Sequence, residues 1–188
     1  MSTASAPGKE GNPFQPPSAN LERPATGGAL FFTTNPVKLL VMSLVTFGVY
    51  PLYWFYCNFK VIRDNGQPKI MPFWRAFFSV IWSYTCFNAI LRSDGWSASP
   101  GRSPLFLAIA YAVLSALSRL PDPWWLVSFL AVLPVMVANG WARERNEARD
   151  PEYDGNSRLN GWNWLGIVLG IAWWLLIISA MAGLLPEE

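Results

Sequence analysis

The sequence contains no histidine and only two cysteines, Cys57 and Cys86. Without histidine the chain cannot build a Ser-His or Cys-His catalytic pair, an imidazole metal site or the usual pH switch near neutrality. The two cysteines have no neighbours at metal-ligand spacing, so a zinc site is not predicted. Glycine motifs for phosphate binding and for a nucleophile elbow are also missing. We therefore predict no catalytic residue, no cofactor and no metal.

Charge is scarce as well. Only 14 % of the residues are charged, whereas an ordinary soluble domain has roughly 25 %. The net charge of +2 is too small for a nucleic-acid-binding face. Hydrophobic residues make up 52 % of the chain and aromatic residues 15 %. This composition excludes a soluble enzyme with a solvated surface. It predicts an integral membrane protein whose main partner is the lipid bilayer.

The N-terminal region lacks a long apolar run. Five prolines between residues 7 and 24 stand among Ser, Ala, Gly and Asn, a composition that cannot bury a core. We predict a disordered tail over residues 1–36, followed by a membrane domain over 37–188. A secretory signal peptide is not expected, because the first apolar run starts too late and no small-residue cleavage site follows it.

Five apolar segments follow the tail, and a membrane helix needs about 20 mostly apolar residues. Gly48 and Pro51 interrupt the first segment and predict a kink. Two prolines around Asp122 separate the third from the fourth and predict a helical hairpin, which is short enough to be re-entrant. We predict an all-α, polytopic helix bundle with spans at about 37–57, 73–91, 104–120, 124–140 and 164–185.

Lysine and arginine set the orientation of such a bundle. With five full spans and the N-terminus inside, nine basic residues lie on the inner side and five on the outer side. If the segment around Gly48 and Pro51 were re-entrant, the counts would be eight and six. The first arrangement has the larger margin, so we predict a cytoplasmic N-terminus.

Small residues recur at helical spacing on two segments. Gly166 and Gly170 form a GxxxG pattern in the last segment, and Ala108, Ala112 and Ala116 stand four apart in the third. Residues four apart share one helix face and allow close backbone approach. Each face is predicted to pack against another helix, either within one protomer or between two protomers.

Polar residues inside the segments are few. Arg75, Asn88 and Asn139 are candidates for intramembrane polar roles, although Arg75 is near a segment end, where its side chain can extend to the headgroups. No predicted span contains Asp, Glu or His, which argues against a proton-driven transporter. Neutral sites built from Asn, Ser, Thr and backbone carbonyls remain open.

The charged stretch after Gly140 predicts a continuation of the fourth helix into water. Three arginines in this stretch are candidates for contact with anionic headgroups, and a solvated helix end with an Arg143–Glu147 pair is the alternative. The candidate headgroup residues are Arg143, Arg145 and Arg149.

The loop after the fourth segment contains a cluster of acidic residues. Asp150, Glu152 and Asp154 stand at the first, third and fifth positions of a calcium-loop pattern, but Gly161 takes the place of the final Glu. A solvated loop is the simpler interpretation. The same three acids, with Arg158, are the only candidates for an enzyme that acts on lipid headgroups.

Three stretches carry a resemblance: Thr46–Tyr56 (TFGVYPLYWFY), Pro72–Phe78 (PFWRAFF) and Asn156–Trp164 (NSRLNGWNW). The first resembles a T-x-G-x-Y-x-x-Y-W-x-Y signature found in uncharacterised bacterial multi-span inner-membrane proteins, and the other two resemble segments of the same group. The resemblance covers residues 35–92 and 139–170. It implies a multi-pass protein of the bacterial inner membrane and brings no activity, because the family's function is unknown.

These observations lead to three function hypotheses. The first is a non-enzymatic packing or interaction component of the membrane, which forms a homo-oligomer or binds a membrane-protein partner through its small-residue faces. The second is a passive pore or carrier for a small solute or lipid, based on the interrupted first segment. The third is the lipid-headgroup enzyme, for which three acids without further metal ligands make a poor site.

Overall fold

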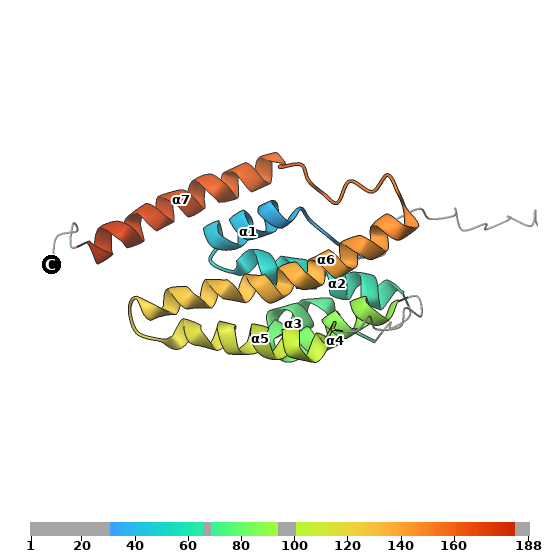
Figure 1. Ribbon diagram of the computed structural model, residues 1–188. Coiled ribbons are helices and arrows are strands. Elements are labelled where there is room, and N and C mark those ends of the chain that lie inside the picture. Colours follow the sequence, from blue (N-terminus) through green and yellow to red (C-terminus); the bar gives the residue numbers. More distant parts are fainter. Residues whose placement is uncertain (1–30, 66–68, 94–100, 183–188) are drawn as a thin grey trace, which may run out of the picture.

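The computed structural model describes residues 31–65, 69–93 and 101–182 (Figure 1). Within these ranges the chain forms seven α-helices and two 3-10 helices, and no strand occurs there. The predicted all-α class is therefore confirmed. Residues 1–30, most of the predicted tail, lie outside the described ranges. The elements are α1 (Pro36–Val45), α2 (Val49–Asp64), α3 (Pro72–Phe77), α4 (Ser79–Arg92), α5 (Pro104–Ala116), η2 (Leu117–Arg119), η3 (Trp124–Ala131), α6 (Val132–Arg149) and α7 (Gly161–Met181).

The segment predicted as one kinked span over 37–57 consists instead of two helices, α1 and α2, that run in opposite directions. The amides of Phe47 and Gly48 bond back to carbonyls in the last turn of α1 at 3.3 and 2.9 Å, the pattern of a Schellman cap. Both residues adopt left-handed conformations, with φ of 52° and 81°. These conformations turn the chain back, so α1 and α2 form a helical hairpin in place of the predicted single kinked span.

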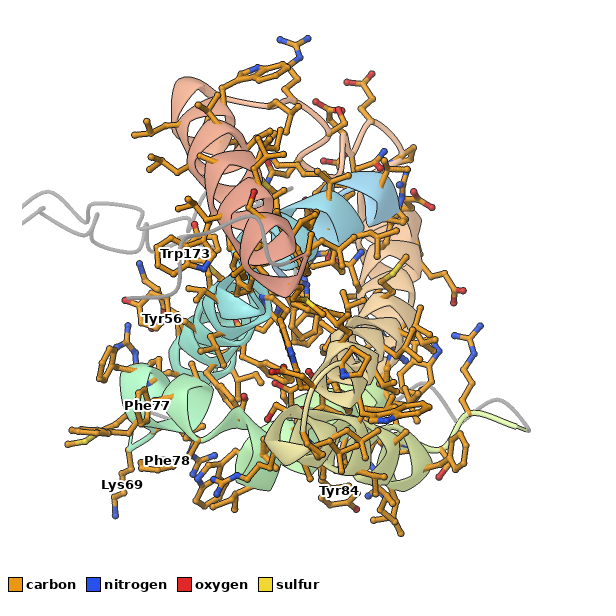
Figure 2. All side chains as sticks on the ribbon, turned by 90° about the vertical axis from the view of Figure 1, so that its left-hand side faces the viewer. Tyr56, Lys69, Phe77, Phe78, Tyr84 and Trp173 are labelled. Carbon is orange, nitrogen blue, oxygen red and sulfur yellow. The ribbon has the colours of Figure 1, made fainter. Side chains whose placement is uncertain are left out.

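The segment predicted as a span over 73–91 is divided as well. Phe78 leaves the helical conformation, with φ −95° and ψ 40°, so α3 has 6 residues and α4 has 14. Neither reaches the about 20 residues that span a bilayer. α3 lies along α2, and its large side chains are exposed. Figure 2 shows Phe77 and Phe78 on this surface.

The predicted hairpin of the third and fourth segments is present. α5 and η2 lead into a turn before η3, and α6 returns alongside α5. As the charged sequence predicts, the returning helix continues past residue 140, to Arg149. The open ends of the hairpin are joined by Arg102 and Glu144, whose guanidinium and carboxylate form two hydrogen bonds of 2.6 and 3.1 Å.

α7 carries the longest apolar run. It has 21 residues and a length of about 31 Å at a rise of about 1.5 Å per residue, close to the hydrocarbon core of roughly 30 Å. Two helices in the described ranges are long and apolar enough to cross a membrane, Trp124–Arg149 and Asn163–Met181. The other predicted spans are shorter, so a bundle of five full spans is not confirmed.

The helix connections gather at two ends of the molecule (Figure 1). The α1–α2 turn lies at the same end as the α5–α6 turn, because the rings of Phe47 and Phe129 are in contact. The opposite end holds the start of α1, the end of α2 and the loop after α6, since Lys38 bonds to Asn156 at 3.2 Å. We call these the turn end and the basic end. Among the described basic residues, only Arg119 belongs to the loops of the turn end.

Residues 31–35 form an extended strap between α2 and α6. Asn146 accepts from the amide of Phe31 at 3.1 Å and donates to its carbonyl at 2.7 Å. Asn139 pairs in the same way with both backbone groups of Thr34, at 3.1 and 2.7 Å. Both asparagines are fully buried, so they satisfy backbone groups that have no helix partner. The sequence predicts a disordered tail through residue 36, whereas residues 31–35 are ordered by these contacts.

Candidate functional site

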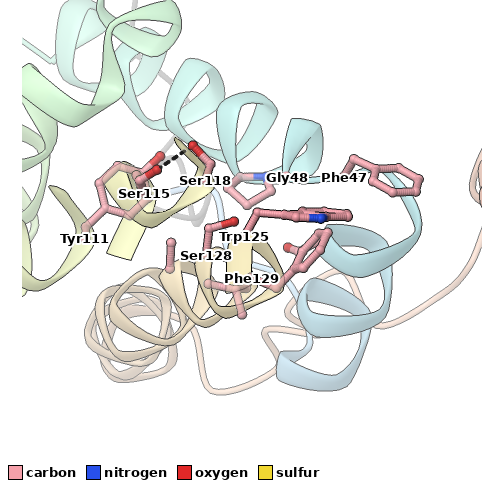
Figure 3. A pocket seen from close by; sticks show the side chains of 12 residues that line it. Phe47, Gly48, Tyr111, Ser115, Ser118, Trp125, Ser128 and Phe129 are labelled. Carbon is pink, nitrogen blue, oxygen red and sulfur yellow. Dashed lines mark hydrogen bonds between the residues drawn. The ribbon is translucent and has the colours of Figure 1, made fainter. Parts of the chain in front are cut away.

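A pocket of about 250 Å³ lies at the turn end, between the α1–α2 turn and the α5–α6 hairpin (Figure 3). The α1–α2 turn leaves room for it, because Gly48 has no side chain and the space that a Cβ would occupy there is open. The lining residues are Ser43, Phe47, Gly48, Pro51, Tyr111, Ser115, Ser118, Trp125, Ser128, Phe129, Ala131 and Val132.

One side of the pocket is aromatic and is supported by α7. Phe47 stacks on Trp174 with ring centroids 5.0 Å apart. Phe129 packs against both Trp174 (5.5 Å) and Trp125 (5.8 Å). The Trp174 indole N–H also donates to the Leu44 carbonyl at 3.0 Å. α7 therefore fixes the rings of the pocket wall, although it does not itself line the pocket.

The other side carries hydroxyl groups, which Figure 3 shows on Ser115, Ser118 and Ser128. The Ser118 hydroxyl donates to the Ser115 carbonyl at 2.8 Å. Tyr111 shares a 3.0 Å hydrogen bond with Ser79 on α4. No partner for the Ser128 hydroxyl occurs among the described residues, so this group is available to a bound molecule.

None of the described residues that line the pocket is charged. A charged molecule would lose its hydration there without gaining a counter-charge, which is costly. A neutral molecule with oxygen atoms can bond to the hydroxyl side and place its apolar part against the rings. Pockets for small ligands commonly combine apolar walls with a few polar groups in this way.

The predicted glycine face packs within the chain. Gly170 lies so close to α1 that a Cβ there would be 2.2 Å from the Val45 carbonyl oxygen, and one on Gly166 would be 3.5 Å from the end of Met42. α7 crosses α1 at this face. The intramolecular alternative is therefore the one that the geometry fits.

The predicted alanine face on α5 runs from the core to the surface. Ala108 is buried, Ala112 is half-buried and Ala116 is exposed. Only the first of them contributes to the core. The exposed end of this face lies near the turn end, because α5 continues there into η2.

The three intramembrane polar candidates are not brought together, and none lines the pocket. Asn139 holds the strap and also accepts from the Trp54 indole at 2.9 Å. The Arg75 guanidinium stacks over Trp82, 4.3 Å from the ring centre, a cation–π contact. The Asn88 side-chain oxygen is buried and has no hydrogen-bond partner among the described residues.

The three headgroup candidates differ in position. Arg149 is exposed, and Arg143 forms the predicted pair with Glu147 at 2.6 Å. Arg145 differs from the expectation, because it is buried and donates to two carbonyls in the last turn of α4, those of Ile90 and Leu91. Helix C-termini present unpaired carbonyls that attract a cation. The sequence places Arg145 in an exposed-looking charged run, and only tertiary packing turns it inward.

The acids of the loop after α6 make local turn contacts. The Asp150 carboxylate accepts from the Glu152 amide at 3.1 Å, and that of Asp154 accepts from Ser157 at 2.7 Å. In the described part of the chain, no three acidic, cysteine or histidine side chains gather where they could hold a metal ion. The loop therefore offers no metal site among these residues.

The serines of the pocket were not identified from the sequence. A serine in an apolar helix has no distinctive spacing, since it often bonds to a carbonyl of its own helix. One signal was present: Ser115 at the end of α5 and Ser118 in η2 are three residues apart, and the predicted hairpin brings Ser128 back toward them.

No protein-family model matches the chain, and no curated protein or solved structure matches it either.

Proposed function

We propose that this chain is a non-enzymatic membrane protein that binds a small uncharged molecule with hydroxyl or carbonyl groups in the turn-end pocket, as a passive carrier. The observation that carries the proposal is the pocket itself, which has an aromatic side, a hydroxyl side and no charged lining residue. It is lined in part by Gly48 and Pro51, the two residues that interrupt the first apolar segment.

The exposed surface of α7 supports a place in the membrane. Only 6 % of its most apolar stretch is buried inside the molecule. Leu169 and Trp173 are 62 % and 58 % exposed, and continuous apolar surface of this kind needs a partner other than water. Lipid tails cover it at the proposed location, the bacterial inner membrane that the sequence resemblance implies.

The charge distribution supports an orientation. The basic end carries almost all lysines and arginines of the described ranges, and basic loops favour the cytoplasmic side. The N-terminus and the loop after α2 then both face the cytoplasm, and the pocket faces the other side. A reporter fused after Lys69 should be cytoplasmic in this arrangement, whereas five full spans would place it outside.

The lining of the pocket lacks a base that could activate a serine for catalysis. Its serines have no histidine, lysine or carboxylate beside them in the lining that could take a proton, and an unactivated hydroxyl is a weak nucleophile. Binding without covalent chemistry is the activity that these residues support.

Two other functions receive less support. The interaction hypothesis relied on small-residue faces, and the Gly166–Gly170 face is already covered by α1. An open pore would need a path to the basic end, but between α2 and α6 the fully buried side chains of Trp54 and Asn139 bond to each other, and Asn139 also bonds to the strap. A carrier that opens to one side at a time is compatible with this closure.

The proposal is tested with purified protein in liposomes by stopped-flow light scattering. Glycerol is the neutral probe and glycerol phosphate the charged one. We expect faster glycerol efflux than from protein-free liposomes and no effect on glycerol phosphate. Ser128→Leu should abolish the difference by filling the pocket, and the control Ser179→Leu on the exposed part of α7 should retain it.

Equal efflux from wild-type and protein-free liposomes would contradict carriage of a small polyol. A neutral ligand that raises the melting temperature of the wild type and of Ser179→Leu, but not of Ser128→Leu, would then show binding without transport.

A further inference from the structure

A second hollow, of about 260 Å³, lies on the outer surface between α2 and α3, and its lining is almost entirely apolar. We call it the α2–α3 groove. Figure 2 shows Tyr56 and Phe77 on its two sides. It is separate from the turn-end pocket and shares no lining residue with it. The residues that define the groove are Val49, Leu52, Tyr53 and Tyr56 from α2 and Phe73, Ala76 and Phe77 from α3.

The α2 wall of the groove continues into positive charge. Val49, Tyr53, Tyr56, Lys60 and Arg63 are spaced by four, three, four and three residues, so they share one face of the helix. The first three line the groove. The last two extend the same face toward the basic end, where Lys60 is exposed. The Arg63 Nε donates to the adjacent Asp64 carboxylate at 3.0 Å, so a phosphate would bond to the terminal guanidinium nitrogens.

The length of this face matches one lipid chain. From Val49 to Lys60 the helix rises about 16 Å at about 1.5 Å per residue. Half of a hydrocarbon core of roughly 30 Å is about 15 Å. An acyl chain whose headgroup end lies beside Lys60 and which follows the groove therefore reaches the middle of the bilayer at Val49.

The rim of the groove faces outward. Phe73 and Phe77 are 61 % and 60 % exposed, so the surface around the groove is as apolar as the groove. In a membrane, lipid acyl chains contact such a surface, and the adjacent cations favour a negative headgroup. A protein helix would need a wider surface than a hollow lined by one face of α2 and the short α3.

We propose that the α2–α3 groove binds one anionic phospholipid of the leaflet at the basic end, with an acyl chain between α2 and α3 and its phosphate beside Lys60 and Arg63. The proposal rests on the membrane placement given under the proposed function. It does not depend on the carrier activity of the turn-end pocket.

The test is native mass spectrometry of the full chain released from mixed micelles with phosphatidylglycerol or phosphatidylcholine. We expect one phosphatidylglycerol molecule to stay bound, and phosphatidylcholine to bind more weakly. Val49→Trp, which fills the open end of the groove, should reduce retention. The double variant Lys60→Gln with Arg63→Gln should weaken phosphatidylglycerol binding roughly thirtyfold, because each cation contributes about fivefold.

Lys69→Gln is the matched control, because Lys69 is also an exposed cation but is not on the face of α2. Equal losses in Lys69→Gln and in the double variant would overturn the site and indicate general surface attraction. Equal retention of both lipids, displacement by glycerol phosphate alone, or a dimer without lipid would also overturn it. Glycerol efflux should remain unchanged in the double variant, so failure here is distinct from failure of the carrier proposal.

Discussion

Gly170 is the position where α7 and α1 approach most closely, and Gly170→Ala should separate them. The added Cβ would be 2.2 Å from the Val45 carbonyl oxygen and 2.6 Å from the Val45 Cβ. Backbone cannot rotate away as a flexible side chain can, so α7 must shift. Trp174 is one turn further on the same face and would lose its bond to the Leu44 carbonyl and its stack on Phe47.

The expected decrease in the free energy of unfolding is the sum of these effects. Overpacking costs about 1–3 kcal/mol, the lost hydrogen bond about 1 kcal/mol, and the lost ring stack about 1 kcal/mol. Because the shift relieves the overpacking as it breaks the contacts, the total should be about 3 kcal/mol. For a chain of this size, such a change lowers the melting temperature by roughly 6–12 °C.

The assay is thermal unfolding in mild detergent, with Gly166→Ala as the matched control. A Cβ on Gly166 would be 3.5 Å from the flexible end of Met42, an ordinary contact, so that variant should melt close to the wild type. Similar melting of both variants and the wild type would refute the close crossing of α7 and α1. A change in cross-linked dimer with no change in melting would assign the glycine face to a second protomer instead.

Three further substitutions test other contacts. Asn146→Ala leaves both backbone groups of Phe31 unpaired in a buried site. We expect the free energy of unfolding to fall by about 2–4 kcal/mol and the strap amides to exchange faster. Asn88→Leu removes a buried oxygen that has no described partner and should raise the melting temperature by a few degrees, while a decrease would reveal a partner. Arg145→Met removes the cap of α4 and should destabilise the protein in neutral and anionic lipid alike, whereas Arg149→Gln should leave melting unchanged.

Some of the fold could be read from local sequence. The two prolines around Asp122 end the helices on either side, which is why the α5–α6 hairpin was predicted. The apolar run that begins at Trp164 predicts a helix from its length and composition alone, and α7 contains this run as far as Met181. The Arg143–Glu147 pair follows from helix spacing alone.

The division of the first two segments could not be read in the same way. A glycine followed by a proline is compatible both with a kink in one helix and with a reversal of the chain between two helices. What decides between them is the left-handed conformation of Phe47, a residue type that rarely adopts it. The stacking of its ring on Trp174, 127 positions away in the chain, compensates for that conformation.

The sequence by itself determined that this chain is helical, poor in charge and without the residues of common active sites, because composition and periodicity act locally. Tertiary structure alone decided that α1 and α2 fold back on each other, that Arg145 points inward and that the serines of α5, η2 and η3 share a pocket. Each of these depends on contacts between residues distant in the chain, which no local pattern encodes.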